Sequence, residues 1–170
     1  IKNILNVEKK FINPDRFDNK KISFLKHLFQ TFFTEKQSNI LISHLFDLFL
    51  KIDHKKLFSD LYMNKNDLKK MIKSGMYIGG HGYNHLRFKN LTKKAQEKEI
   101  KLTLKFLKLI KAPIKDWIMC YPYGSFNNNL IKILKKRKSI CAFTTQKGLV
   151  DLKKDNYFKL KRLDTNDINF

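Results

Sequence analysis

Two histidines four residues apart are the part of this sequence best suited to do chemistry. His81 and His85 lie in the segment 78–85, which also contains glycines at 79, 80 and 82. Neutral imidazole is the commonest side-chain ligand of zinc-like ions, and a catalytic site of that kind takes three protein ligands and leaves one position open. The segment is therefore a candidate metal site. With 5 histidines in the chain, a pair at this spacing also arises by chance, so it needs support from its surroundings.

Short apolar strands precede this and other polar clusters. Met76, Tyr77 and Ile78 predict a brief buried strand, and the glycines at 79 and 80 allow a sharp turn at its end. The polar clusters that follow predicted strands are residues 81–85, 122–125, 144–146 and 162–164. Because α/β enzymes place their chemistry at the carboxyl ends of parallel strands, we expect these clusters to share one rim. Taken singly, each cluster is also an ordinary turn sequence, and this holds most clearly for residues 121–124.

Helices and strands alternate in the second part of the chain. Asn64 predicts the start of a helix that stops at Gly75, Thr92 predicts the start of a long helix that ends near Pro113, and a further helix is expected around residues 130–134. Strands are predicted at 76–79, 117–121 and 140–143. This alternation predicts parallel strands joined by helical crossovers, hence an α/β fold with too few strands for a closed eight-stranded barrel.

The first part of the chain has a different pattern. Residues 1–16 show no clear period, whereas from Asp18 onward apolar residues share one helical face: Ile22, Leu25, Phe29 and Phe32. Thr34 with Gln37 predicts a capping box for a second helix that runs to about Leu50. We therefore expect an irregular lead-in at 1–16, a helical region at 17–61 and an α/β region at 62–170. The other histidines, His27, His44 and His54, are interpreted as solvated surface residues.

The chain is strongly basic. Its net charge of +21 comes from 36 Lys and Arg against 15 Asp and Glu, which raises nucleic acid or an anionic surface as a partner. The lysines are spread along nearly every helix instead of forming one stripe, and Lys, Asn, Ile and Phe are abundant together, as A/T-rich codons would make them. We favour a solvated basic surface over a specific nucleic-acid site by about three to one, and keep a nucleic-acid binder as an alternative.

Composition sets further bounds. With 42% apolar residues the chain can bury a core, and no apolar run is long enough to cross a membrane. Cys120 and Cys141 stand in separate apolar stretches and are expected to be buried small hydrophobes. No signal peptide is visible, which favours the cytoplasm, although the chain opens on Ile1 instead of Met.

The order of these motifs resembles a known family. The likeness is carried by residues 75–85 (Gly-Met-Tyr-Ile-Gly-Gly-His-Gly-Tyr-Asn-His), 121–127 (Tyr-Pro-Tyr-Gly-Ser-Phe-Asn), 142–145, Gly148 and 160–162. Over roughly residues 60 to 167 the sequence resembles the polysaccharide deacetylase family, also called the NodB-homology domain. The helical stretch 17–61 resembles an insertion in members associated with surface-polysaccharide biosynthesis. Residues 62–170 would then be the C-terminal part of a NodB-like domain.

The resemblance implies a partial, distorted (β/α) barrel and a divalent metal, expected to be zinc, held by two histidines and one aspartate. His81 and His85 would be the histidine ligands, the backbone N–H of Tyr123 would stabilise the oxyanion, and Arg162 would orient the catalytic base. The remaining implied site residues, as substrate contacts, are Tyr121, Pro122 and Gly124. The implied reaction removes an N-acetyl group from a sugar of a surface polysaccharide or its precursor by metal-activated water.

The chain also departs from the family. Members begin with a Thr-Phe-Asp-Asp-Gly string, whose two aspartates are the general base and the third metal ligand, and no Asp-Asp pair occurs in this sequence. No histidine follows His85 to protonate the leaving amine, and Asp164 and Asp167 are weak substitutes by position. We therefore expect a truncated deacetylase portion whose barrel an upstream segment or a partner chain completes. The alternative is a non-catalytic remnant or a carbohydrate-binding module.

Overall fold

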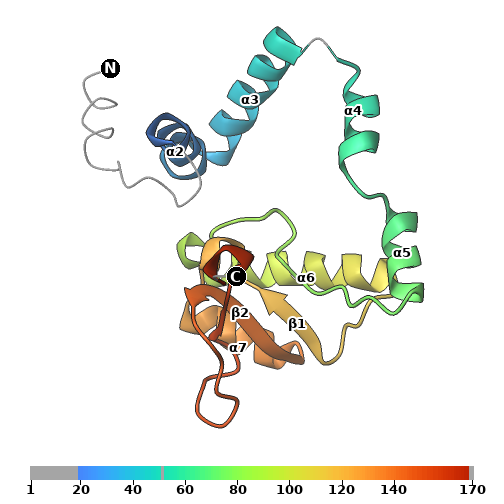
Figure 1. The fold of residues 1–170 in the computed structure, drawn as a ribbon, viewed down its shortest axis with the longest axis vertical. Coiled ribbons are helices and arrows are strands. Elements are labelled where there is room, and N and C mark those ends of the chain that lie inside the picture. Colours follow the sequence, from blue (N-terminus) through green and yellow to red (C-terminus); the bar gives the residue numbers. More distant parts are fainter. Residues whose placement is uncertain (1–18, 51, 169–170) are drawn as a thin grey trace. The chain divides into compact units, whose positions relative to one another are not determined.

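The chain is divided into two compact units, Ile1–Tyr62 and Met63–Phe170. The computed structural model describes residues 19–50 and 52–168, so the predicted lead-in at 1–16 and the start of the first predicted helix at Asp18 lie outside the described residues (Figure 1). The division falls next to the expected start of the α/β region at residue 62. That the first part is an insertion into a larger domain stays a prediction.

The described part of the first unit is helical. Helix α2 (Lys20–His27) is capped by Asn19 and is followed by a π-helical turn at Leu28–Phe32. Helix α3 (Glu35–Leu50) begins with the predicted capping box, in which the Gln37 N–H donates to the Thr34 hydroxyl at 3.3 Å and the Thr34 N–H donates to the Gln37 amide oxygen at 3.0 Å. Helix α4 (His54–Leu61) begins after Asp53, whose carboxylate accepts from the Lys55 N–H. The predicted helix to Leu50 is therefore confirmed.

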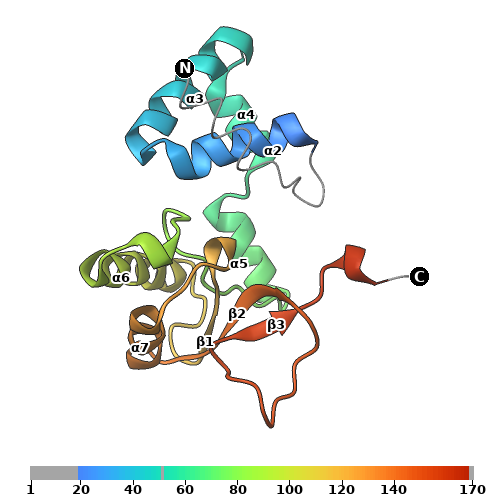
Figure 2. The ribbon, with the colours of Figure 1, turned by 90° about the vertical axis from the view of Figure 1, so that its left-hand side faces the viewer.

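The second unit is built on a parallel sheet. Strands β1 (Trp117–Cys120), β2 (Ser139–Lys147) and β3 (Leu160–Arg162) form a 3-stranded sheet in the order β1-β2-β3, and both pairings are parallel. Helices α6 (Lys93–Leu109) and α7 (Asn128–Lys136) lie on the same face of this sheet, and α5 (Lys65–Lys73) precedes them in the chain (Figure 2). The predicted α/β class is confirmed.

Local signals explain where these helices begin. Asn64 caps α5 in a capping box with Asp67, Thr92 caps α6, and Asn127 caps α7. The core between the helices and the sheet is mainly apolar, with Trp117 and Met119 of β1 fully buried. Each such side chain contributes roughly 1.5–3 kcal/mol through burial of apolar surface. This packing holds the carboxyl end of β1, which the polar cluster 122–125 follows, whereas the cluster predicted to follow a strand at 144–146 lies within β2.

The predicted buried strand at 76–79 is wrong. Met76 and Tyr77 are exposed, and the segment pairs with β1 through a single parallel bridge between Gly80 and Met119. The Gly80 N–H donates to the Ile118 carbonyl at 2.8 Å and the Cys120 N–H donates to the Gly80 carbonyl at 2.8 Å. One step earlier the ladder stops, because the Ile118 N–H donates to the Tyr77 hydroxyl at 3.0 Å. A side-chain oxygen thus takes the donor that a continuing strand would need.

Candidate metal and active site

The two histidines of the segment 78–85 converge. The Nε2 atoms of His81 and His85 lie 3.1 Å apart, and their ring centroids are separated by 4.8 Å. The chain can fold back this tightly because Gly82 has φ 76° and His85 has φ 55°, both in the left-handed region. Gly80 allows the loop to approach the sheet closely, since a Cβ there would lie 2.6 Å from the Trp117 ring. The spacing in the sequence becomes a pair of facing imidazoles.

A backbone contact fixes the orientation of one imidazole. His81 Nδ1 lies 2.9 Å from the Cys120 carbonyl oxygen, which can only accept, so Nδ1 carries the proton. In the neutral ring this leaves the lone pair on Nε2, the atom that faces His85. A hydrogen bond from the outer ring nitrogen to a carbonyl is the usual support of a metal-binding histidine. Burial lowers the pKa of His85, and the charges of His81 and Arg87 lower it further, which favours the neutral form of the His85 ring.

Glu99 of α6 holds the loop that carries both histidines. Its side chain is buried, with 4% of the residue exposed, and its Oε2 accepts from the backbone N–H groups of Tyr83 at 3.1 Å and Asn84 at 2.9 Å. Its Oε1 accepts from the Asn84 side-chain amide at 2.6 Å. We did not predict this residue from the sequence. The available signal was a run of polar side chains on the buried face of α6, where Gln96, Glu99 and Thr103 recur at intervals of three and four residues.

Tyr123 stands beside the histidine pair. It lies in the turn Pro122–Gly124 after β1, in a left-handed conformation with φ 56°. Its ring meets that of His85 edge to face at 4.7 Å, and the Arg87 guanidinium lies 4.0 Å from its centroid. The hydrogen bonds that close the turn run from Gly124 to Tyr121 and from Ser125 to Pro122, each at 2.9 Å. Neither uses the Tyr123 N–H that was predicted to stabilise an oxyanion.

The predicted substrate contacts occupy different surroundings. Tyr121 is 1% exposed, stacks on Phe126 at 4.7 Å and donates its hydroxyl to the Phe158 carbonyl at 3.0 Å, so its side chain belongs to the core. Pro122 is also buried. Gly124 has φ 61° and lies directly against Thr145, leaving no room for a side chain. These three residues shape the turn that presents Tyr123, and their contact with substrate stays a prediction.

Arg162 ends β3 on the same rim as Cys120. Burial raises the pKa of the Cys120 thiol, while the charge of Arg162 acts in the opposite direction. Asp164 and Asp167, the carboxylates considered as substitutes for the missing base, follow Arg162 in the chain and form other hydrogen bonds and an ion pair. Asp164 and Asp167 form a capping box around the turn Thr165–Asp167, and Asp167 pairs with Lys147 at 3.0 Å. Their predicted catalytic use thus competes with a structural one.

The histidine pair fits a divalent metal as part of a ligand set. Two ligands of a tetrahedral zinc ion at about 2.0–2.1 Å stand roughly 3.3 Å apart, and the two Nε2 atoms are separated by 3.1 Å. Ligation needs a neutral imidazole, and burial lowers the pKa of His85 in that direction. Among the described residues no group of three or more His, Cys, Asp or Glu side chains could hold a metal ion. The two histidines would thus form only part of a ligand set.

Comparison with solved structures supports the fold. The chain is similar to the Streptococcus pyogenes deacetylase PplD in complex with acetate, with a TM-score of 0.56 and 21% identity over 64% of this chain and 47% of that chain. It is similar to the BpsB deacetylase domain from Bordetella bronchiseptica, with a TM-score of 0.52 and 15% identity over 61% and 49% of the two chains. It is also similar to a de-N-acetylase from Aggregatibacter actinomycetemcomitans, with a TM-score of 0.51 and 19% identity over 65% of this chain and 51% of that chain.

These likenesses show a partial, distorted (β/α) barrel of the NodB-homology type, as predicted. The chain spans about half the length of these three solved structures, from 47% to 51%. No curated protein matches it. In the described residues no helix is long and apolar enough to cross a membrane.

The family model described as polysaccharide deacetylase matches residues 29–138, more than half of the chain. The chain therefore belongs to the polysaccharide deacetylase family.

Proposed function

We propose that this chain is part of a metal-dependent hydrolase that removes an N-acetyl group from a sugar of a surface polysaccharide or of its precursor. The observation that carries the proposal is the imidazole pair, whose Nε2 atoms lie 3.1 Å apart while His81 is oriented by the Cys120 carbonyl. An imidazole that is held through its outer nitrogen and turns its inner nitrogen toward a second imidazole has the arrangement of metal-binding histidines. Membership of the deacetylase family supports the reaction class.

The proposed roles follow from position. His81 and His85 hold a divalent metal, for which zinc fits the nitrogen ligands, and Glu99 keeps their loop in place. The bound metal would polarise the acetamide carbonyl and lower the pKa of a water molecule. Tyr123 offers its N–H to the oxygen that becomes negative when the carbonyl is attacked. Arg162 stands on the same rim to orient a carboxylate base that the described residues do not supply.

Metal binding by the purified chain tests the proposal. We expect saturable binding of one Zn²⁺ per chain in calorimetry, lost on His81→Ala and on His85→Ala. His44→Ala is the matched control, because His44 is an exposed histidine of α3 and should leave binding unchanged. Binding that survives both loop substitutions, or that falls equally with His44→Ala, would contradict the proposed site. Cobalt in place of zinc adds a visible spectrum that reports nitrogen ligation.

One observation favours a second candidate, a sugar-binding module without catalysis. Among the described residues no group of three or more ligands could hold a metal ion, and Glu99, the carboxylate that contacts the histidine loop, already accepts three hydrogen bonds. A catalytic base contributes roughly 100- to 10,000-fold to such reactions. The two candidates differ in turnover. Acetate release from an N-acetylated oligosaccharide, by the chain together with a segment carrying the Asp-Asp pair, supports the hydrolase; saturable sugar binding without release supports the module.

A further inference from the structure

One face of α6 carries a line of lysines. Lys94, Lys98, Lys101, Lys105 and Lys108, here called the lysine stripe, recur at intervals of four and three residues and are all exposed. At about 100° per residue they fall within a sector of about 80° and extend along about 21 Å of the helix axis. None forms an ion pair in the described part of the chain. The lysines are spread over several helices, as the sequence indicated, and those of α6 also share one face.

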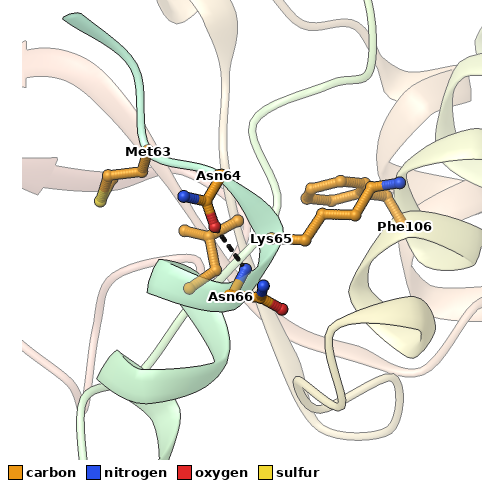
Figure 3. Close-up of a pocket in the computed structure, with 6 residues that line it drawn as sticks. Met63, Asn64, Lys65, Asn66 and Phe106 are labelled. Carbon is orange, nitrogen blue, oxygen red and sulfur yellow. Dashed lines mark hydrogen bonds between the residues drawn. The ribbon is translucent and has the colours of Figure 1, made fainter. Parts of the chain in front are cut away.

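A pocket of about 620 Å³ lies at the C-terminal end of the stripe. Tyr83, Phe106 and Leu109 give it apolar walls, and its lysines include Lys65 as well as Lys105 and Lys108 of the stripe. Figure 3 shows Lys65 extending from the start of α5 alongside the Phe106 ring. Tyr83 and Leu109 are 54% and 53% exposed, so the pocket is open to a ligand. Its volume falls in the range of small-molecule sites.

This pocket adjoins the candidate metal site. A smaller pocket of about 270 Å³ is lined by His81 and Gly82 together with Tyr83 and Phe106, the two aromatic residues that also line the larger pocket. Tyr83 belongs to the loop that carries both histidines, and its N–H is held by Glu99. A ligand could thus reach from the imidazole pair, past Tyr83, to the lysines of α6.

We propose that the lysine stripe and the pocket at its end bind a negatively charged polysaccharide. A row of ammonium groups about 5 Å apart along the axis suits a linear chain that repeats its carboxylates, and lysine acts as a point charge without fixed geometry. The apolar walls suit the faces of sugar rings. As a substrate subsite this proposal rests on the proposed deacetylase function and makes the substrate an acidic N-acetylated glycan; as a binding surface it stands by itself.

The same features disfavour other polyanions. Proteins that bind single-stranded nucleic acid interleave basic and aromatic side chains for base stacking. Between Lys94 and Lys108 the one aromatic residue is Phe106, at the pocket end, so most of the stripe offers no ring on which a base could stack. A helix that lies on a membrane buries its apolar face in the lipid. In α6 that face is occupied by the core, where Ile100 and Leu107 are 0% and 2% exposed.

Two charge-matched variants test the proposal. Lys98→Gln, Lys101→Gln and Lys105→Gln together remove three charges from the stripe; Lys132→Gln, Lys136→Gln and Lys138→Gln together remove three exposed charges on and after α7. Binding to alginate oligosaccharides, neutral dextran, oligo(dT) and phosphatidylserine vesicles is measured for both. We expect alginate binding to weaken about tenfold in the stripe variant and less than about twofold in the control, with no binding to dextran.

Each other outcome overturns the proposal. Equal weakening in both variants would mean that overall charge attracts the polymer, and tighter stripe-dependent binding of oligo(dT) or vesicles would assign the surface to another partner. His81→Ala keeps this test separate from that of the metal site. It should lose metal and retain alginate binding, so failure of one proposal leaves the other standing. Loss of alginate binding in folded His81→Ala protein would count against the stripe.

Discussion

Removal of the Glu99 carboxylate should loosen the loop that carries the histidine pair. The carboxylate accepts three hydrogen bonds, at 3.1, 2.9 and 2.6 Å, and is 96% buried since only 4% of the residue is exposed. A hydrogen bond to a charged group contributes about 1.5–3 kcal/mol, and a buried donor left unpaired costs about 1–3 kcal/mol. Tyr83 and Asn84 are themselves exposed, so their N–H groups can turn to water. We therefore expect Glu99→Ala to cost about 3 kcal/mol locally.

Metal affinity reports this cost. If about half of it must be recovered to bring His81 and His85 together again, zinc binding weakens by about tenfold. Glu99→Gln keeps two acceptor sites without the charge, and neutral hydrogen bonds have about half the strength, so it should weaken binding by only about threefold. Glu97→Ala is the matched control, because Glu97 is an exposed glutamate of the same helix.

Two measurements check the reasoning. Hydrogen exchange of the Tyr83 and Asn84 amides should accelerate in Glu99→Ala while exchange in β1 stays as it was, and calorimetry should give the predicted order of zinc affinities. If Glu99 had only a structural role, its substitution would lower the stability of the whole unit without producing this order of zinc affinities. Unchanged exchange of the two amides, together with wild-type affinity, would refute the role assigned to Glu99.

Three further outcomes are expected. The pKa of His85 should lie below 6.5, because burial and nearby positive charge disfavour its imidazolium. The unfolded chain then binds more protons than the folded chain, so this contribution to the free energy of unfolding is complete above pH 6.5 and is lost as the pH falls through the folded pKa. A His85 proton resonance that titrates at pH 6.5 or higher would contradict this. Gly124→Ala should lower the free energy of unfolding by about 3 kcal/mol, because the new methyl group would overlap Thr145 and φ is 61°. Gly75→Ala is the control and should cost about 1 kcal/mol, because Gly75 has φ 84° and open space around it. Equal urea midpoints for the two variants would exclude overlap with Thr145 as the cause. Tyr121→Phe should cost about 1–2 kcal/mol by leaving the Phe158 carbonyl unpaired; weaker glycan binding at unchanged stability would instead make Tyr121 a substrate contact.

Local signals in the sequence predicted most of the fold. Capping residues such as Asn64 and Thr92 satisfy N–H groups within their own helix, so their effect can be predicted without knowledge of the rest of the chain. The segment 76–79 failed because its pairing depends on the Tyr77 hydroxyl and Ile118, which are 41 residues apart. Apolar residues alone do not reveal that a side chain ends the ladder.

The candidate site was predictable in part. The spacing of His81 and His85 is visible in the sequence, but their convergence needs the Cys120 carbonyl, 39 residues away from His81. Glu99 was missed because its partners lie 15 and 16 residues away in a loop. The lysine period of α6 is visible in the sequence, but the pocket at its end is not, because it brings together Lys65, Tyr83 and Phe106 from separate segments.

His85 and Tyr123 both hold backbone angles that glycine adopts more easily, with φ 55° and 56°. For a residue with a Cβ this costs roughly 1–2 kcal/mol. A change to glycine at either place would relax the chain and discard the ring. Selection for thermal resistance alone would therefore tend to replace these two residues with glycine. A variant that keeps both rings is one in which their function is still under selection.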